Sequence, residues 1–215
     1  FKQLKPIPVE DILDRDVITL NKSAIAKSIE GKRIMITGAA GSIGSEICRQ
    51  LIHYSPESLL LVDQAESPLH ALSLELAEAE AGIKIDLILG DITDASHMRS
   101  LIEKNRPQVL YHAAAYKHVP LVEANAVEGI KTNVLGTRSL TDLALEFKVE
   151  RFVLVSTDKA VNPTNVMGAT KRAAEIYVQS RPAGNTIFIT TRFGNVLGSN
   201  GSVIPLFKEQ IEKGG

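Results

Sequence analysis

The sequence predicts an α/β fold, in which a doubly wound parallel sheet carries helices on both faces. After Gly31, short apolar runs alternate with longer stretches that have helical periodicity. Most of the apolar runs lack the alternating polarity of a strand with one solvated face, so we expect their strands to be buried on both sides. Regular alternation of such strands with helices is typical of a parallel sheet. The predicted strands are Arg33–Thr37, Leu59–Asp63, Ile85–Leu89, Val109–His112, Phe152–Ser156 and Thr186–Thr191, and the predicted helices are Ile43–His53, Pro68–Glu80, Ala95–Lys104, Asn133–Phe147, Val166–Val178 and Val203–Lys213.

The first 30 residues differ from the rest of the chain. Phe1–Pro8 contains two prolines and two lysines, and Val9–Leu13 has the length of about one helical turn. We therefore interpret residues 1–30 as an N-terminal linker or lid segment, and residues 31–215 as one domain. No strand is predicted after Val203–Lys213, so we expect part of a C-terminal substrate domain to be missing from this chain.

Composition and charge exclude several classes of protein. The net charge is −1, which gives no general attraction for nucleic acids or anionic membranes. No apolar run approaches the ~20 residues that cross a bilayer, and the N-terminus lacks the pattern of a signal peptide. Cys48 is the single cysteine, which excludes an internal disulfide and fits a reducing cytoplasm. The histidines lack ligand spacing and cysteine partners, so no metal site is expected.

A glycine loop follows the first predicted strand and opens a helix. Gly38 allows a tight turn, Gly41 lets the backbone approach a pyrophosphate, and Gly44 allows close packing of helix on strand. The helix N-terminus adds N–H groups and positive potential. The Gly-x-x-Gly-x-x-Gly spacing resembles that of the short-chain dehydrogenases/reductases, so we expect a dinucleotide here. The loop residues predicted to contact the cofactor are Gly38, Ala40, Gly41, Ser42, Ile43 and Gly44.

Two acidic residues follow later strands. Asp63 ends the second predicted strand, where a carboxylate can bind the adenosine ribose hydroxyls and repel a 2′-phosphate, which favours NAD over NADP. A solvated turn aspartate is the alternative. Asp91, with Ile92 beside it, is placed where an acid can meet the adenine amino group, or else serves as a helix cap or turn residue. Small side chains after the fourth strand, at Ala113, Ala114 and Ala115, would let the cofactor lie flat across the sheet edge.

Hydroxyl, acidic and basic groups follow the fifth predicted strand. Thr157, Asp158 and Lys159 come directly after Ser156. In the next predicted helix, Met167 and Lys171 are four residues apart and share a face. This layout resembles the Tyr-x-x-x-Lys motif of short-chain dehydrogenases/reductases, with methionine in place of tyrosine. Lys171 can bind the nicotinamide ribose, but the Met167 thioether has no exchangeable proton and cannot act as a base. A core methionine beside a surface lysine is the alternative.

Asp158 and Lys159 add groups that a simple dehydrogenase does not need. Adjacent residues of a strand point to opposite faces, so both can reach one substrate only if the strand has ended. Asn162–Asn165 predicts a loop there. The pair could donate and accept protons in an elimination, although an acid needs a raised pKa and a neighbouring ammonium lowers it. Burial of the pair or a neutral Lys159 would resolve this conflict, and an ordinary surface pair is the alternative.

Together, these motifs resemble the catalytic domain of the bacterial nucleotide-sugar 4,6-dehydratases of the CapD-like polysaccharide biosynthesis group. Those enzymes are extended short-chain dehydrogenases/reductases with a Rossmann fold. The long-form UDP-N-acetylglucosamine 4,6-dehydratases are the most similar, because they also carry methionine at the tyrosine position. The resemblance extends from Gly31 to the end of the chain, and the matching segments are Gly38–Gly44, His112–Pro120, Thr132–Thr137, Ser156–Lys171 and Arg192–Ser202.

The resemblance implies an NAD-dependent cycle on a UDP-sugar. In that cycle the cofactor oxidises C4, Lys159 removes the C5 proton, Asp158 protonates the departing C6 hydroxyl, and the hydride returns to C6. Thr157 would hydrogen-bond the C4 oxygen, while Thr157, Asp158 and a water remain alternatives as the base for the C4 hydroxyl, with Tyr116 and His118 further away. Asn133 would order the active-site helix or a water. The residues assigned to the substrate side are Lys117, His118, Asn133, Asn195, Ser199, Asn200 and Val203. For Lys117 and His118, a structural role in the loop is the alternative.

The predicted function is therefore an NAD-dependent dehydratase of UDP-N-acetylglucosamine in capsule or O-antigen biosynthesis. A 4-epimerase or 4-ketoreductase shares the hydride step but does not need Asp158 and Lys159, and a non-catalytic NAD-binding module is the other alternative. Related enzymes pair through helices beside the fourth and fifth strands, so we expect a homo-oligomer. A cytoplasmic location is predicted. If the parent protein carries the membrane helices of its long relatives, the domain would lie on the cytoplasmic face of the inner membrane.

Overall fold

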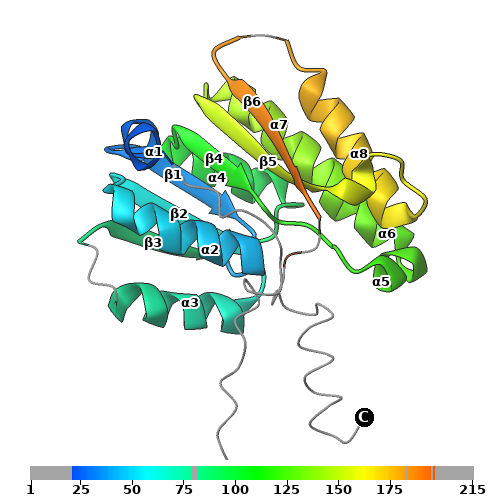
Figure 1. The fold of residues 1–215 in the computed structure, drawn as a ribbon, viewed down its shortest axis with the longest axis horizontal. Helices are drawn as coiled ribbons and strands as arrows, with labels where there is room; N and C mark the ends of the chain where they lie inside the picture. Colours follow the sequence, from blue (N-terminus) through cyan, green and yellow to red (C-terminus); the bar gives the residue numbers. More distant parts are fainter. Residues whose placement is uncertain (1–20, 79–81, 183, 195, 197–215) are drawn as a thin grey trace, which may run out of the picture.

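Six parallel strands form one sheet in the order β3-β2-β1-β4-β5-β6 (Figure 1). The computed structural model describes residues 21–78, 82–182, 184–194 and 196. The strand order reverses between β1 and β4, which is the arrangement of the Rossmann fold and leaves a crevice at the carboxyl ends of these two strands. The strands are β1 (Arg33–Thr37), β2 (Ser58–Asp63), β3 (Lys84–Leu89), β4 (Val109–His112), β5 (Arg151–Thr157) and β6 (Ile187–Phe193).

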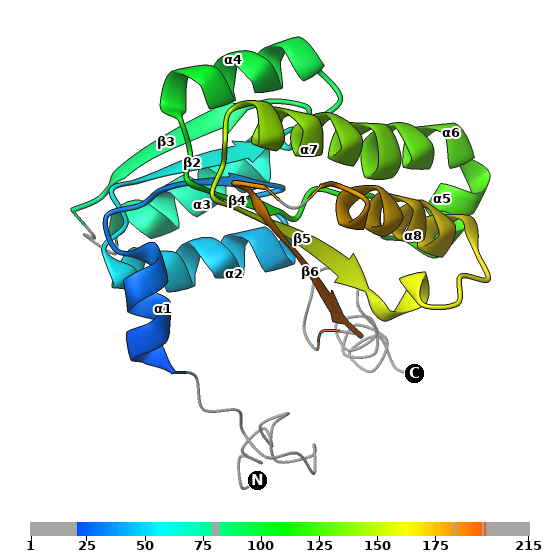
Figure 2. The same cartoon turned by 90° about the horizontal axis from the view of Figure 1, so that it is seen from above.

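Helices cover both faces of this sheet. Figure 2 shows α4, α7 and α8 on one side, and α1, α2 and α3 on the other. The described helices are α1 (Lys22–Ile29), α2 (Ser42–Leu51), the 3₁₀ turn η2 (Ile52–Tyr54), α3 (Glu66–Glu78), α4 (Ala95–Asn105), α5 (Val119–Ala124), α6 (Ala126–Gly129), the π-helical segment η3 (Ile130–Gly136), α7 (Thr137–Glu146), the 3₁₀ turn η4 (Asp158–Ala160) and α8 (Val166–Gln179).

Two hydrophobic cores lie on the two faces of the sheet. On β1, Met35 packs into the core beneath α4 and α7, whereas Ile34 and Ile36 pack into the core beneath α2 and α3. Successive side chains of a strand point to opposite faces, so a run of apolar residues supplies both cores at once. Full burial of each such side chain contributes about 1.5–3 kcal/mol to the stability of the folded state. This packing keeps the strands parallel, so their carboxyl ends meet at one edge of the sheet.

The doubly wound parallel sheet is confirmed. Each predicted strand is present, and its ends differ from the prediction by at most two residues. The predicted helix Asn133–Phe147 is different, because its first residues belong to the π-helical segment η3 and only Thr137–Glu146 is α-helical. The short helices α5 and α6 were not predicted, and the predicted helix Val203–Lys213 lies outside the described residues.

Helix α1 falls within the segment predicted as a linker or lid. Its Asn21 N-cap accepts a hydrogen bond from the Ala24 backbone N–H, and its Ile29 is buried in the core beneath α2 and α3. Residues 1–20 lie outside the described part of the chain. Among the described helices, none has both the length and the apolar character that a bilayer span requires.

Candidate active site

The glycine loop between β1 and α2 has the close backbone packing that its sequence predicts. Gly38 has a φ of +72°, and a Cβ there would lie 2.4 Å from the backbone nitrogen of Ala114. A Cβ on Gly44 would lie 2.0 Å from the Gly38 carbonyl oxygen. A side chain at Gly38 would therefore force the β1–α2 loop away from the segment that follows β4, and a side chain at Gly44 would force α2 away from that loop. Gly41 is the N-cap of α2, so the first N–H groups of that helix open towards the sheet edge.

Asp63 connects this loop to the end of β2. One carboxylate oxygen, Oδ2, accepts a hydrogen bond of 2.9 Å from the Ala40 backbone N–H, and Oδ1 accepts one of 2.9 Å from the Ala65 N–H. Each carboxylate oxygen has a second lone-pair site, so both can still accept a bond from a ribose hydroxyl. The two backbone N–H groups thus fix the orientation of the carboxylate beside the glycine loop.

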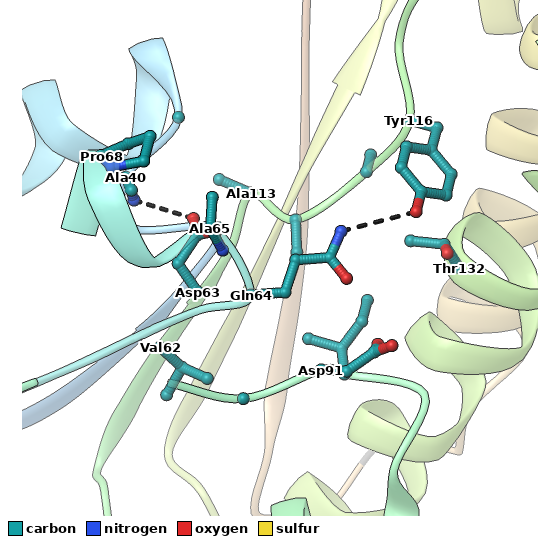
Figure 3. A pocket seen from close by; sticks show the side chains of 16 residues that line it. Ala40, Val62, Asp63, Gln64, Ala65, Pro68, Asp91, Ala113, Tyr116 and Thr132 are labelled. Atoms are coloured by element: carbon teal, nitrogen blue, oxygen red, sulfur yellow. Dashed lines mark hydrogen bonds between the residues drawn. The ribbon is translucent and has the colours of Figure 1, made fainter. Parts of the chain in front are cut away.

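A pocket of about 220 Å³ lies at the switch point of the sheet, between these segments and the end of β4 (Figure 3). Gln64, which follows β2, reaches towards Tyr116, which follows β4, with 3.5 Å between Nε2 and the phenolic oxygen. Many residues predicted to contact the cofactor line this pocket: Gly38, Ala40, Gly41, Asp63, Asp91, Ile92, Ala113, Ala114 and Ala115. The sequence did not single out Gln64, Pro68 or Thr132, which line it too. The predicted contacts Ser42, Ile43 and Gly44 belong to the start of α2 beside the pocket.

These residues fit a dinucleotide. At Gly38 and Gly44 a Cβ would collide with backbone, so this loop requires glycine, and a diphosphate approaches the main chain at a loop of this kind. Asp91 lines the pocket, and its Oδ1 also accepts a hydrogen bond of 2.8 Å from the Thr93 N–H, so it has the turn role that the sequence left open. The described residues contain no cluster of three or more His, Cys, Asp or Glu side chains that could hold a metal ion.

Asn133 is fully buried in the π-helical segment and joins two parts of the site. Its Oδ1 accepts a 2.8 Å hydrogen bond from the Tyr116 N–H, and its Nδ2 donates to the Tyr116 carbonyl and to Thr170 Oγ1, each at 3.0 Å. Both amide protons are therefore used within the protein. This geometry favours the predicted role of ordering helix α8 over direct contact with a substrate.

His112 extends the same network to the glycine loop. Its Nε2 lies 2.8 Å from Thr137 Oγ1, and its Nδ1 lies 2.7 Å from Thr37 Oγ1. Because the Thr137 hydroxyl donates to the Asn133 carbonyl, it must accept from Nε2–H, so Nδ1 accepts from Thr37. Burial, with a smaller contribution from the Lys171 charge, lowers the pKa of His112 to about 3. A neutral histidine thus links the residue before Gly38 to α8.

Thr157, Asp158 and Lys159 lie at the carboxyl end of β5, where the strand passes into η4. The Thr157 hydroxyl donates a 2.9 Å hydrogen bond to Asp158 Oδ1, and Lys159 Nζ lies 3.3 Å from the same oxygen. The Thr157 hydrogen bond, helped by Lys159, lowers the pKa of Asp158 below its ordinary value. Asp158 is therefore a carboxylate at neutral pH. The suggested burial of the pair is wrong, because the Asp158 and Lys159 side chains are 56% and 37% exposed.

Met167 and Lys171 share the inner face of α8, and both are buried. Lys171 Nζ donates a 2.7 Å hydrogen bond to the Val155 carbonyl on β5. Burial lowers the pKa of Lys171 to about 8, and the charge of Glu175 partly offsets this effect. A Cβ on Gly168 would lie 2.5 Å from the Lys159 carbonyl oxygen, so α8 packs directly against the turn that carries Asp158 and Lys159.

The remaining predicted residues fall into two groups. Lys117 and His118 are exposed at the end of the loop that follows β4, where His118 precedes α5. Asn195, Ser199, Asn200 and Val203 lie outside the described residues. The sequence analysis missed Glu175, a buried carboxylate on α8 that pairs with Arg172 and Arg192.

Comparison with known proteins identifies relatives across almost the whole chain. A family model described as "Polysaccharide biosynthesis protein" matches residues 34–215. Capsular polysaccharide biosynthesis protein CapD of Staphylococcus aureus is 46% identical over 215 residues, which is 99% of this chain and 36% of that protein. The UDP-N-acetylglucosamine 4,6-dehydratase (inverting) of Campylobacter jejuni strain 81-176 is 37% identical over 86% of this chain and 55% of that protein. A UDP-glucose 4-epimerase of Rickettsia canadensis is 36% identical over 85% and 54%.

Solved structures agree with the fold. The structure of Pen from Bacillus thuringiensis superimposes with a TM-score of 0.80 at 34% sequence identity, and the match covers 86% of this chain and 59% of that one. DesIV, a dTDP-glucose 4,6-dehydratase from Streptomyces venezuelae with NAD and TYD bound, superimposes with a TM-score of 0.71 at 25% identity over 85% of this chain and 63% of that one.

The predicted family is confirmed by these matches. The chain spans 36% to 55% of the length of the three relatives named above. Its match to the family model covers most of its residues, including the strands that carry the glycine loop and the Thr157–Lys159 segment. The chain therefore belongs to the polysaccharide biosynthesis protein family, in which dehydratases and epimerases of nucleotide sugars are its relatives.

Proposed function

We propose that this chain is the catalytic domain of an NAD-dependent UDP-sugar 4,6-dehydratase, and that its substrate is UDP-N-acetylglucosamine. The observation that carries the proposal is the group formed by Thr157, Asp158 and Lys159 at the carboxyl end of β5. It combines a hydroxyl, a carboxylate and an amine on the same sheet edge as the dinucleotide pocket. An enzyme that only oxidises or epimerises C4 has no need of a second acid–base pair.

The cofactor is NAD. Asp63 supports this choice, because its carboxylate is fixed beside the glycine loop and would repel a 2′-phosphate. When bound, NAD supplies the hydride chemistry of the cycle.

The Thr157–Asp158 hydrogen bond gives a route for the first proton. Asp158 starts as a carboxylate and accepts from the Thr157 hydroxyl. The C4 hydroxyl of the sugar can therefore pass its proton through Thr157 to Asp158, which makes the tyrosine position, occupied by Met167, unnecessary for this step. Asp158 is then protonated and can act as the acid for the C6 hydroxyl.

Lys159 and Asp158 together account for the protons that move in the elimination. In this scheme Lys159 takes the C5 proton, while Asp158 gives its proton to the departing C6 hydroxyl, which leaves as water. With the hydride from C4 that bound NAD would return to C6, Lys159 would give a proton back to C5 after its ammonium has exchanged with solvent. The sugar then has lost one molecule of water, and both side chains are restored. This scheme makes Lys159 essential for elimination but not for oxidation at C4.

The test is proton NMR of UDP-N-acetylglucosamine incubated in D₂O with NAD⁺ and the intact protein. A new 6-methyl signal from a 4-keto sugar, with deuterium at C5, is expected. Lys159→Ala should abolish this signal, whereas the matched control Lys104→Ala, an exposed lysine near the end of α4, should leave it unchanged.

Two other results would replace the proposal. A C4 epimer without a 6-methyl signal would assign the protein to the epimerases, which the Rickettsia relative makes the second candidate. If no UDP-sugar is converted and none raises the melting temperature while NAD⁺ does, the chain is an NAD-binding module.

The assembly is also part of the proposal. We expect the protein to bind a UDP-sugar, to form a homo-oligomer, and to act in the cytoplasm or on the cytoplasmic face of a membrane in capsule biosynthesis.

A further inference from the structure

Glu175 is a fully buried carboxylate on α8, one turn beyond Lys171. Arg192 on β6 binds it with two hydrogen bonds, Nε to Oε1 at 2.7 Å and Nη2 to Oε2 at 2.5 Å. Arg172 adds a third, from Nη1 to Oε2 at 3.2 Å. A buried charge is tolerated only when it is paired and hydrogen-bonded in this way, so the arrangement specifies one position of α8 relative to β6.

The same helix face is attached to two strands that end at the reacting centre. Lys171 and Glu175 are separated by one helical turn, and Lys171 binds the Val155 carbonyl on β5. Arg192 pairs in register with Ser156, the residue before Thr157. Two residues after Arg192, a Cβ on Gly194 would lie 3.6 Å from Asp158 Oδ2. The Glu175–Arg192 pair therefore holds the end of β6 against the acid that the proposed reaction uses.

Glu175 is also the charge that faces the Lys171 ammonium. Burial acts to raise the pKa of Glu175, but hydrogen bonds from Arg192 and Arg172 outweigh it, so Glu175 is ionised. His112, which faces Lys171 from β4, is neutral at neutral pH. The other charged groups on elements packed against α8 have partners elsewhere: Glu123 with the Val166 N–H, Glu128 with Lys131, Arg138 with Asp142, Asp142 also with Tyr177 and Arg181, Glu146 with Arg99, Arg151 with the Ser28 carbonyl, and Asp158 with Thr157 and Lys159.

We propose that Glu175 is a positioning residue that keeps the Lys171 ammonium charged and the end of β6 in place at the reacting centre. This inference rests on the proposed function, because it takes the edge formed by β5 and α8 as the place where the cofactor and sugar react. Glu175 is fully buried and does not line the dinucleotide pocket. Glu175 acts through the electrostatic attraction between its carboxylate and the Lys171 ammonium. Arg172 and Arg192 partly neutralise this carboxylate and so weaken that attraction.

The test is the pH dependence of NAD⁺ affinity, measured without sugar on the intact protein between pH 6.5 and 9.5. In the wild-type protein the affinity should fall near pH 8, as Lys171 loses its charge. Glu175→Gln keeps the shape of the side chain but removes its charge, so the midpoint of this fall should move at least about half a pH unit lower. Arg172→Gln removes a neutralising partner and should move the midpoint in the opposite direction.

A matched control separates this role from simple support of the helix. Glu123→Gln is the same chemical change at the N-terminus of α8, where Glu123 accepts a 2.6 Å hydrogen bond from Val166 but does not face Lys171. Its midpoint should equal that of the wild-type protein. Unshifted midpoints in both Glu175→Gln and Arg172→Gln would overturn the inference and leave a structural ion pair.

Two further outcomes are also decisive. If Glu175→Gln does not fold, Arg172→Gln decides alone, because its side chain is 38% exposed and its loss leaves the Arg192 pair intact. If the wild-type protein binds no NAD⁺ at any pH, the proposed function fails and the inference fails with it. Normal wild-type binding with unshifted variants refutes the inference only.

Discussion

Replacement of Asn133 by alanine should destabilise the protein strongly, because this side chain makes three hydrogen bonds inside the structure. The bonds join it to the backbone N–H and carbonyl of Tyr116 and to the Thr170 hydroxyl, at 2.8, 3.0 and 3.0 Å. A typical hydrogen bond contributes about 1 kcal/mol net, so the three together correspond to about 3 kcal/mol of unfolding free energy. The Thr170 hydroxyl keeps its bond to the Met167 carbonyl, which limits the loss on that side.

Chemical denaturation measures this effect. The Asn133→Ala variant should unfold at a lower denaturant concentration with an unchanged m-value. Asn125→Ala provides the matched control, because Asn125 is exposed and its side chain donates a 2.9 Å hydrogen bond to the Leu121 carbonyl. The control should stay within about 0.5 kcal/mol of the wild-type protein. A loss below about 1 kcal/mol for Asn133→Ala would refute the reasoning, since it would mean that water replaces the amide without cost.

Three further outcomes follow from buried groups near the site. Lowering the pH from 7 to 5 should reduce stability by about 2 kcal/mol through His112 alone, because its pKa of about 3 in the folded protein lies below the ordinary 6.5, and the unfolded state takes up the proton. His112→Gln should remove that slope in urea titrations. The pKa of Lys171 is about 8 in the folded protein and 10.5 ordinarily, so at pH values between these two the unfolded state binds more protons than the folded state. The stability of the wild-type protein relative to Lys171→Met should therefore rise by about 2 kcal/mol from pH 7 to 9.5, and a flat difference would contradict the burial of the ammonium. Gly168→Ala should lower the melting temperature in calorimetry despite alanine's higher helix propensity, because its Cβ would lie 2.5 Å from the Lys159 carbonyl; an equal or higher melting temperature would show that α8 can move aside.

The parts of the fold that the sequence predicted well are those with a strong periodic signal. The runs that form β1 and β2 are apolar on both faces, because each strand supplies side chains to two cores. The glycine after β1 and the aspartate at the end of β2 mark the ends of these strands directly in the sequence. The short helices α5 and α6 have six and four residues, too few to show a helical period. The segment η3 could not be recognised, since a π turn inserts a residue into the pattern that a helical period assumes.

In the candidate site, too, some residues could be predicted from local sequence patterns and others could not. Gly38, Asp63 and Lys171 stand at fixed distances from strand ends, so their places follow from motif spacing. From the sequence alone, Glu175 is predicted to be an ordinary exposed charge on an amphipathic helix. Its partner Arg192 is 17 residues away on the edge strand β6, and only the pairing of β6 with β5 brings the two charges together. Long-range ion pairs of this kind have no local signal in a single sequence.

The π-helical segment Ile130–Gly136 separates the requirements of the core from those of the site within one continuous stretch of chain. Regular α-helix advances about 100° per residue, so the extra residue of a π turn rotates everything before it relative to everything after it. Here α7 keeps Leu140 and Leu143 in the core, while Asn133, four residues before the start of α7, hydrogen-bonds Tyr116 and Thr170. Deletion of one residue from this segment is consequently the smallest edit that would preserve the packing of α7 and disconnect the loop after β4 from α8. Related chains that lack the extra residue would need another side chain to make that connection.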